Sequence, residues 1–423
     1  MSGARSQVGG ALLRGITRNV LLLGLVSFLT DVSSEMLTYL IPLFLVNVLA
    51  ASPGVVGVIE GLAESAATLF RLLSGWLSDR FERRTVLVGF GYGFSVLGKA
   101  LYLVATSWPI VLAARLGDRF GKGIRTAPRD ALIADSTPED TRGRAFGFHR
   151  ALDTAGAVVG VAIAAIVVQM LQGDVVQLAG DTFRTLVLIA LVPGAAAVLV
   201  IVLAVRDVPR KRATAGAESK AEARPPRMDA SLLRRFPASF WFFVLASGLF
   251  ALGNSSDAFL SLRSQNLGLA VRDLLFVVLA FNITNAVVSL PAGAASDRFG
   301  RRGPIAVAWA LYALVYLGFA LAGSVGAVPV LWIVYGAYYG ISDAVGRALV
   351  ADLAPVELRA TGYGILNAVV GLLLLPASIL AGQLWDRIGP SAPFWFGAAC
   401  AAGGTLLLVT LVRPAPNRVA AAG

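Results

Sequence analysis

The stretch PIVLAARLGDRFGKGIRTAPRDALIAD, residues 109–135, is long enough to span a membrane, yet it carries seven charged side chains between residues 115 and 130. At about 100° per residue, these seven fall within an arc of roughly 140° on one helix face. A charge at the bilayer centre costs at least ~2.5 kcal/mol, so this face must line a polar interior instead of contacting lipid. The seven residues are Arg115, Asp118, Arg119, Lys122, Arg125, Arg129 and Asp130.

The composition of the chain agrees with a membrane protein. Of its 423 residues 57% are hydrophobic and only 14% are charged, and the mean hydropathy is +0.75. Soluble domains contain about 25% charged residues. The single cysteine, Cys400, and the single histidine, His149, exclude an internal disulfide and Cys-based or His-rich metal sites, so we expect no metal and no cofactor.

Twelve apolar segments are long enough for the ~20 residues that a bilayer requires. The first is too long for the core of a signal peptide and lacks a small-residue cleavage site, so we expect it to be retained. The predicted spans are 18–50, 55–78, 84–105, 109–134, 144–171, 184–205, 237–265, 271–295, 303–323, 328–353, 360–385 and 391–413.

The distribution of Lys and Arg predicts the orientation. With the N-terminus inside, 23 of the 36 basic residues fall in cytoplasmic segments and four on the opposite side. This bias places both termini in the cytoplasm of a cell-membrane protein. It also explains the net charge of +11 without nucleic acid, because basic segments contact anionic lipid headgroups.

Residues 206–236 are rich in Pro, Ala and charge and have no apolar period, so we predict a flexible cytoplasmic linker. It separates an N-terminal six-helix bundle, residues 1–205, from a C-terminal six-helix bundle, residues 237–423. The halves are related in sequence, because three segments recur in the same order at offsets of 217 to 223 residues. The pairs are TDVSSEM at 30 with GNSSDAF at 253, GWLSDRFERR at 75 with GAASDRFGRR at 293, and ALIADSTPEDTRGRAFG at 131 with ALVADLAPVELRATGYG at 348.

These features resemble the major facilitator superfamily, and the resemblance covers nearly the whole chain. The motif that carries it follows the second span and recurs after the eighth; Glu82 departs from the glycine usual in the family. The resemblance implies an all-α membrane protein with twelve transmembrane helices in two pseudo-symmetric six-helix bundles, each built from inverted three-helix repeats. It also implies a monomer that carries a small-molecule substrate by rocker-switch alternating access.

The repeated motif is predicted to act as a conformational latch. Its aspartates can accept hydrogen bonds from a neighbouring helix N-terminus or pair with Arg, which would hold one side of the protein closed. The alternative is that its arginines only set the topology. The latch residues are Gly75, Asp79, Arg80, Arg83, Arg84, Gly293, Asp297, Arg298, Arg301 and Arg302.

The two halves differ in the charge that they place inside the membrane. The N-terminal half has seven acids and eight bases within its spans, so most of these charges can pair with one another. The C-terminal half offers mainly neutral hydrogen-bonding groups. Its cavity candidates are Asn254, Asp257, Asn282, Asp343 and Arg347.

Three interpretations of the N-terminal charges remain open. They can form a proton relay, with Asp31 and Glu35 foremost and Glu60 and Glu64 as further candidates. They can form an anion-binding stripe, or they can be a structural network only. The substrate or cavity candidates on the fourth span are Arg115, Arg119, Lys122 and Arg125, of which Arg115 corresponds to the arginine of helix 4 in the family that the chain resembles.

We therefore expect secondary active transport of a small solute. Proton-coupled export of a drug or metabolite is the first expectation, and uptake or exchange of an organic anion is the alternative. No phosphate-binding glycine loop is present, which argues against an ATP-driven pump. No nucleophile–base arrangement is visible, which argues against an enzyme. His149 is expected to cap or contact a loop, and Gly156, Gly160, Gly336 and Gly340 are expected to let helices pack closely.

Overall fold

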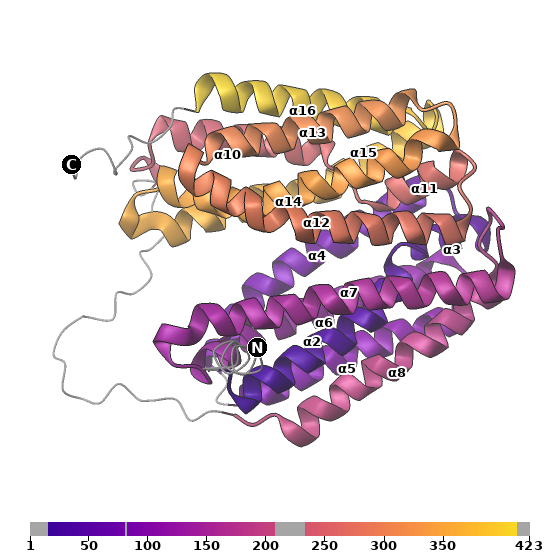
Figure 1. Cartoon of the computed structure of the whole chain (residues 1–423), viewed down its shortest axis with the longest axis horizontal. Helices are drawn as coiled ribbons and strands as arrows, with labels where there is room; N and C mark the ends of the chain where they lie inside the picture. Colours follow the sequence, from indigo (N-terminus) through magenta and orange to yellow (C-terminus); the bar gives the residue numbers. More distant parts are fainter. Residues whose placement is uncertain (1–15, 81–82, 208–232, 413–423) are drawn as a thin grey trace, which may run out of the picture. The chain divides into compact units, whose positions relative to one another are not determined.

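A computed structural model describes residues 16–80, 83–207 and 233–412. Most of the predicted linker and both chain ends lie outside these residues. The described part is helical and contains no strand (Figure 1). Its longer helices are α2 (Arg18–Thr38), α3 (Ile41–Asn47), α4 (Pro53–Arg80), α5 (Arg84–Ala100), α6 (Trp108–Asp135), α7 (Arg142–Gln172), α8 (Gly180–Ala204), α10 (Ala238–Gly253), α11 (Ala258–Asn266), α12 (Val271–Phe299), α13 (Arg302–Leu321), α14 (Val328–Leu353), α15 (Arg359–Arg387) and α16 (Ala392–Leu411).

Each of the twelve predicted spans corresponds to a helix or to a broken helix. In the described part of the chain, eleven helical segments are long and apolar enough to cross a membrane. The predicted span that is missing from these eleven is α6, because its charged stripe lowers its hydropathy. The all-α fold predicted from the sequence is confirmed.

Two predicted spans are interrupted. The first consists of α2 and α3, which meet at Tyr39 and Leu40. Pro42 lies in the first turn of α3, and its missing N–H cannot continue the hydrogen-bond ladder of α2. The seventh consists of α10 and α11, separated by the non-helical residues 254–257.

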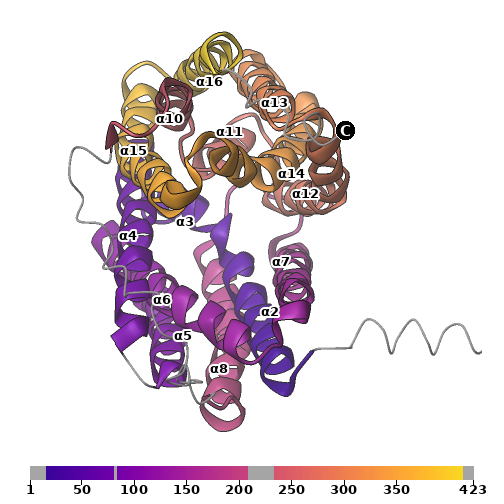
Figure 2. The same ribbon diagram turned by 90° about the vertical axis from the view of Figure 1, so that its left-hand side faces the viewer.

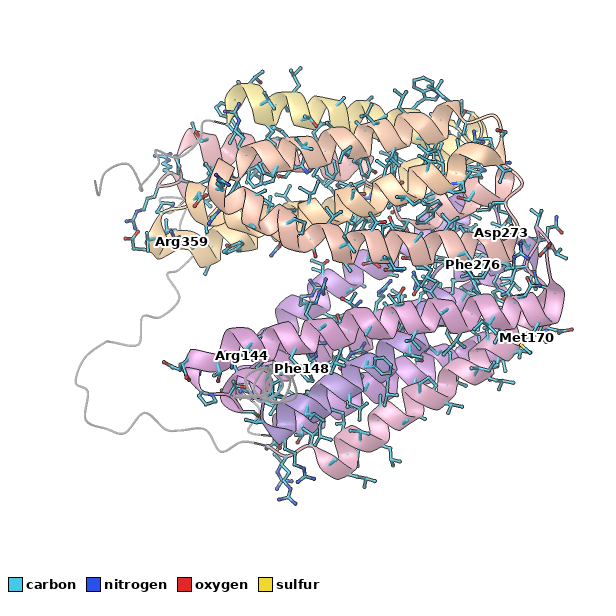
Figure 3. All side chains as sticks on the ribbon, in the orientation of Figure 1. Arg144, Phe148, Met170, Asp273, Phe276 and Arg359 are labelled. Carbon is cyan, nitrogen blue, oxygen red and sulfur yellow. The ribbon has the colours of Figure 1, made fainter. Side chains whose placement is uncertain are left out.

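The chain forms two compact units. The first contains α2 to α8, and residues 268–279 group with it. Within this unit α5 and α4 pack on α6, and α2 packs on α7 and α8 (Figure 1). The helix α7 is long and carries Arg144 near one end and Met170 near the other (Figure 3).

The second unit repeats the packing of the first. Here α13 packs on α14 and α16, and α10 packs on α15 and α16 (Figure 2). These pairs correspond to α5 on α6 and α8, and to α2 on α7 and α8. The relation between the halves that was predicted from sequence is therefore also present in the helix packing.

The predicted glycine contacts are confirmed at α7 and α14. A Cβ placed on Gly160 would lie 2.6 Å from the carbonyl oxygen of Val32 on α2, and one on Gly336 would lie 2.6 Å from that of Phe281 on α12. Only glycine allows these helix backbones to approach so closely.

Candidate transport site

The charged face of α6 meets acidic residues of α4. Arg115 donates from Nε to Glu60 Oε1 at 2.9 Å, and a second guanidinium nitrogen donates to Oε2 of the same carboxylate. The side chains of both residues are at most 5% exposed. A buried two-point Arg–carboxylate pair of this kind fixes the two helices to one another. The geometry thus favours a structural role for Glu60 over the predicted proton-carrying role.

A second pair lies one turn further along both helices. Arg119 contacts Glu64 at 2.7 Å, and the Glu64 side chain is 38% exposed. The repeat follows from sequence, because residues 60 and 64 and residues 115 and 119 are each separated by one helical turn. Glu64 is thus also paired, while Nε of Arg119 is buried and has no hydrogen-bond partner among the described residues.

Two further basic side chains of this unit are buried against neutral groups. Arg125 donates to Ser95 Oγ at 2.6 Å, and its guanidinium lies 4.3 Å from the ring centroid of Tyr92. Lys99 donates to Ser33 and Ser34 at 2.8 and 2.9 Å. These contacts join α5 to α6 and to α2, so Arg125 packs between helices instead of standing open to a substrate.

The predicted proton site Asp31 lies beside a carboxyl group that sequence reasoning did not select. The carboxyl groups of Asp31 on α2 and Asp153 on α7 lie beside each other, and Asp153 accepts a hydrogen bond from Ser27 Oγ at 2.6 Å. We call Asp31 and Asp153 the carboxyl pair. Two carboxyl groups can hydrogen-bond to each other only when one of them carries a proton. Asp153 precedes Gly156 and Gly160, the glycines that bring α7 onto α2, and that proximity was the available signal.

Glu35 and Lys122 complete this side of the unit. Glu35 lies one turn after Asp31 on α2, and the nearest charges acting on it come from Lys122 and Arg119 of α6. Neither Glu35 nor Lys122 forms an ion pair within 4 Å in the described part of the chain. The Lys122 side chain is exposed. These two groups are therefore more available to a solute than the pairs at Glu60 and Glu64.

The second unit places Asp257, one of its two predicted cavity acids, at the interruption of the seventh span. Asp257 accepts hydrogen bonds from Tyr335 at 2.6 Å and from Tyr339 at 3.2 Å, both on α14. Asn254 ends α10, and Asn282 lies on α12. The tyrosines were not selected from sequence. The side chains of Asp343 and Arg347 lie outside the described residues.

The repeated motif contributes one ion pair to each unit. Arg84 pairs with Asp135, and Arg301 pairs with Asp352 at 2.9 Å. Each pair joins the start of one helix to the end of the next, and we call them the end clamps. Beside each clamp an arginine that begins the following helix donates to a carbonyl at the same helix end: Arg142 to Ala134 at 3.3 Å and Arg359 to Ala351 at 3.0 Å.

The end clamps change the predicted latch in one respect. The aspartates that pair with the motif arginines are Asp135 and Asp352, which belong to the repeated segments that begin at 131 and 348. The side chains of Asp79, Arg80 and Asp297 lie outside the described residues, Gly75 lies on α4, and Arg83 and Arg298 are exposed. Arg302 donates to the carbonyl of Val409, and Gly293 lies on α12. When the two motif sequences are aligned, Arg301 corresponds to Arg83. In the end clamps, however, Arg301 has the role that Arg84 has in the first unit.

Comparison with known proteins agrees with this architecture. The sequence profile described as Major Facilitator Superfamily matches residues 23–270 and 256–423. The chain belongs to the Major Facilitator Superfamily. An uncharacterised MFS-type transporter of Methanocaldococcus jannaschii is 34% identical over 402 residues, which is 94% of this chain and 95% of that protein.

Two shorter similarities involve resistance proteins. The class C tetracycline resistance protein of Escherichia coli is 38% identical over 27% of this chain and 28% of that protein. The quinolone resistance protein NorA of Staphylococcus aureus is 22% identical over 35% and 38%. Among solved structures, a mutant of the nucleoside transporter NupG has a TM-score of 0.74 at 13% identity over 93% of this chain and 100% of that one. A D-xylose–proton symporter has a TM-score of 0.72 at 17% identity over 95% and 98%.

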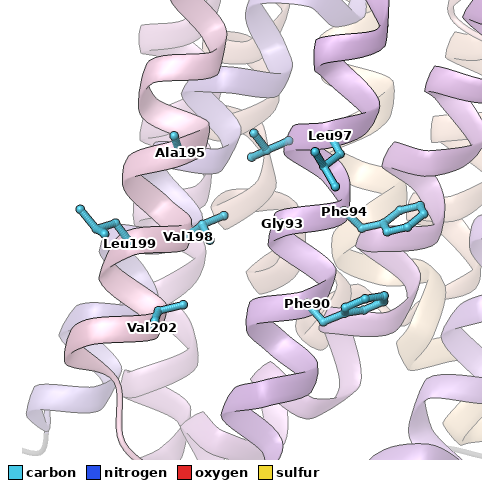
Figure 4. Close-up of a pocket in the computed structure, with 9 residues that line it drawn as sticks. Phe90, Gly93, Phe94, Leu97, Ala195, Val198, Leu199 and Val202 are labelled. Atoms are coloured by element: carbon cyan, nitrogen blue, oxygen red, sulfur yellow. The ribbon is translucent and has the colours of Figure 1, made fainter.

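This member of the superfamily is therefore a multi-pass membrane transporter and not an enzyme. The surface groove between α5 and α8 offers no recognition chemistry for a polar solute. The groove between α5 and α8 has a volume of about 480 Å³ and is lined by Phe90, Phe94, Leu97, Val198, Val202 and similar apolar side chains (Figure 4). Such a surface is typical of one that faces lipid, because it offers no polar group to orient a solute.

Proposed function

We propose that this transporter exports small organic molecules in exchange for protons, by rocking of its two bundles, residues 1–205 and 237–423. The observation that carries the proposal is the carboxyl pair. Asp31 and Asp153 lie beside each other inside the first unit, while Glu60 and Glu64 are paired with arginines. An interior carboxyl pair that holds one proton can bind or release a proton as its surroundings change.

The proposed cycle uses the residues around this pair. A proton from outside binds the carboxyl pair and neutralises it, the bundles rock, and the proton leaves toward the cytoplasm. Glu35 lies one turn away and close to Lys122 and Arg119, so it is the second candidate for the coupling proton. Arg115, locked to Glu60, keeps α4 and α6 together during the movement.

Several features accompany this proposal. The protein is a monomer in the cell membrane with both termini in the cytoplasm, where its basic segments meet anionic headgroups. The end clamps lie on the cytoplasmic side in this orientation. Asp79 and Asp297 act as the latch that opens when the bundles separate, and the segment 206–236 links the bundles.

Similarity to resistance proteins supports the substrate class. The tetracycline and quinolone resistance proteins match 27% and 35% of this chain. Two heterocyclic compounds, tetracycline and the quinolone norfloxacin, are therefore the first probes to use.

The direct test uses everted membrane vesicles that hold the full chain. Acridine orange reports an imposed proton gradient, and tetracycline or norfloxacin is then added. Proton–substrate exchange predicts partial dissipation of the gradient, which Asp31→Asn abolishes while leaving the amount of inserted protein unchanged. Gradient-independent accumulation of both probes by the wild type would contradict proton coupling.

A second function, transport of an organic anion, is favoured by one observation. Nε of Arg119 is buried without a hydrogen-bond partner among the described residues, and Lys122 is exposed one turn away. Together they can bind a carboxylate or a phosphate. A thermal-shift screen of the purified protein against organic anions and lipophilic cations separates the two functions. Stabilisation by anions alone, lost in Lys122→Gln, would favour the anion carrier.

A further inference from the structure

The single histidine is buried in the interior of the first unit. His149 on α7 is 5% exposed, and its Nε2 atom is buried without a hydrogen-bond partner among the described residues. Buried polar side-chain atoms nearly always have such a partner, so this nitrogen requires an explanation. The capping or loop-contact role expected from sequence would place Nε2 on a backbone group, and no such contact is present in the described part of the chain.

The position of His149 along α7 indicates a role for its unpartnered Nε2 atom. His149 lies seven residues after Arg142, the first residue of α7, which is about 10 Å along the axis at ~1.5 Å per residue. Phe148, the preceding residue, lies near the same end of α7 as Arg144 (Figure 3). Asp153 follows one turn deeper on the same face, since residues i and i+4 of a helix share a face.

Asp153 connects this position to the carboxyl pair. Its carboxyl group accepts a hydrogen bond from Ser27 Oγ at 2.6 Å and lies beside the carboxyl group of Asp31 on α2. Three titratable side chains thus follow one another from the end of the bundle toward its middle: His149, Asp153 and Asp31. The series starts at His149, near the end of the bundle at which α7 begins. This end is cytoplasmic in the proposed orientation.

The charged groups around His149 come from two helices. On α6 they are Arg129 and Asp130, which form an ion pair at 2.9 Å. On α7 they are Arg150 and Asp153, which lie 3.5 Å apart. The charged residues of α8 are Asp181 and Arg184, at the far end of the unit, and those of α2 are Arg18, which is exposed at the start of the helix, Asp31 and Glu35. Arg129 and Arg150 thus each have an acid beside them, and Asp153 is the acid shared with the carboxyl pair.

We infer that His149 is the proton-relay residue between the cytoplasm and the Asp31–Asp153 carboxyl pair. Neutral imidazole accepts a proton at one ring nitrogen and releases another from the second, so it passes protons without net change. In the export cycle the proton leaves Asp153 for one nitrogen of His149, and the second nitrogen gives a proton to cytoplasmic water. The ring then returns to its first tautomer. This inference rests on the proposed proton coupling.

The chain allows a test that needs no substrate. Because His149 is its only histidine, ring-labelled ¹⁵N-histidine gives one set of imidazole signals in the full chain, purified without a histidine tag and placed in lipid nanodiscs. We expect the imidazolium fraction at a fixed pH to fall in Asp153→Asn, which removes the nearest carboxylate. We expect it to rise in Asp31→Asn, which leaves Asp153 without its proton-sharing partner. Identical titration curves in wild type and both variants would overturn the inference.

A transport measurement provides the second arm. His149→Gln keeps the size and polarity of the side chain but cannot be protonated. In the vesicle assay with tetracycline it is expected to slow proton-coupled flux by roughly tenfold or more, as for loss of a general acid–base group. Tetracycline exchange at equal pH on both sides moves no net proton and is expected to remain at the wild-type rate. Thr154→Val, whose hydroxyl bonds only to the Arg150 carbonyl, is the matched control and should leave both rates unchanged.

The outcomes separate the relay from the proposal beneath it. Wild-type coupled flux in His149→Gln would overturn the relay and leave proton coupling intact. Loss of exchange and of thermal stability together would show that His149 has a structural role, which also overturns the relay. Absence of proton-coupled flux in the wild type would contradict the proposed function, while the nanodisc titration would still decide whether His149 responds to the carboxyl pair.

Discussion

At the scale of single residues, the charges of one helix face have different roles because their neighbours differ. Arg115 is enclosed with Glu60, whereas Lys122 is exposed three residues after Arg119 on the same helix. A fully enclosed pair is costly to break because the remaining charge stays buried. An exposed lysine can be neutralised without that cost. Removing the partner of Arg115 is therefore expected to destabilise the protein, whereas neutralising Lys122 is not.

We expect Glu60→Gln to destabilise the protein strongly. The substitution leaves the Arg115 guanidinium buried without its counter-ion, which costs about 3–5 kcal/mol. The melting temperature of the purified protein in detergent should fall, and a double variant with Arg115→Gln should recover part of the loss. Glu64→Gln is the matched control, because its carboxylate is 38% exposed and the loss there should be smaller. Equal melting of Glu60→Gln and wild type would show that the pair contributes nothing.

Substitutions at Asp31 and Glu35 are expected to affect transport differently from stability. Neutralising the acid that carries the coupling proton should abolish gradient-driven flux, while substrate exchange without a net proton movement survives. A structural acid would instead lower the melting temperature and exchange together. Flux and exchange are measured in one preparation of Asp31→Asn and of Glu35→Gln. Normal gradient-driven flux in both variants would leave the anion carrier as the better explanation.

The sequence predicted these residue roles only in part. Near balance of seven acids and eight bases indicated that the interior charges pair, and the pairs of Arg115 and Arg119 agree with this. It could not indicate which acid meets which base, because partners lie on different helices and depend on their rotation. Asp153 was missed for the same reason, since its partner Asp31 lies 122 positions earlier in the chain.

At the scale of elements, the end clamps make a prediction that depends on the repeat. Asp135→Asn and Asp352→Asn remove equivalent ion pairs from the two units, and both pairs are partly exposed. Exposed pairs contribute about 0–1 kcal/mol, so we expect little change in melting temperature. If the clamps control the cytoplasmic side, both variants should reduce flux to a similar degree. The exchange of charges in Arg84→Asp with Asp135→Arg should restore it; loss of expression in either single variant would contradict this interpretation.

Close packing of α7 on α2 predicts that alanine substitutions at two glycines of α7 will differ strongly in their effect on stability. Gly160→Ala would place a Cβ 2.6 Å from the Val32 carbonyl oxygen, so the helices must separate. Overpacking of this kind costs roughly 1–3 kcal/mol. Gly147→Ala meets nothing within 4 Å and should be neutral or slightly stabilising, since alanine favours helix. The comparison is made by melting temperature, and equal behaviour would contradict the packing argument.

Elements were easier to predict than their interruptions. The pattern of long apolar segments located all twelve spans, because each needs about 20 residues whatever its partners, although the charged stripe lowers the hydropathy of α6. This pattern predicted one continuous span at 18–50 and another at 237–265, and the structure interrupts both. Pro42 was visible in the sequence, but proline is tolerated in many membrane helices, so it did not decide the break. The interruption at 254–257 brings Asp257 to Tyr335, a contact that no local pattern contains.

At the scale of the whole molecule, the similarity of the two units suggests two bodies joined by a tether. Packing of α5 on α6 and α8 recurs as α13 on α14 and α16, so each unit holds its own helices together. A transporter that works by rocking such bodies needs a connection that lets them change their relative orientation. The sequence of 206–236, with its Pro, Ala and charged residues, is suited to that task.

Shortening the tether should therefore be tolerated. Each doubling of loop length raises the free-energy cost of loop closure by only ~0.6 kcal/mol. Deleting about half of residues 213–224 therefore changes this cost by a fraction of that amount. Expression, melting temperature and flux should stay close to the wild type as long as the remaining chain spans the two units. Replacing 213–224 with a Gly/Ser sequence of equal length is the control for composition, because it removes the charges and keeps the reach. If deletion abolishes folding while the Gly/Ser replacement does not, length is the limiting property. If both variants fail, this segment folds against the bundles as an ordered element, and the description of the molecule as two bodies on a flexible tether is wrong.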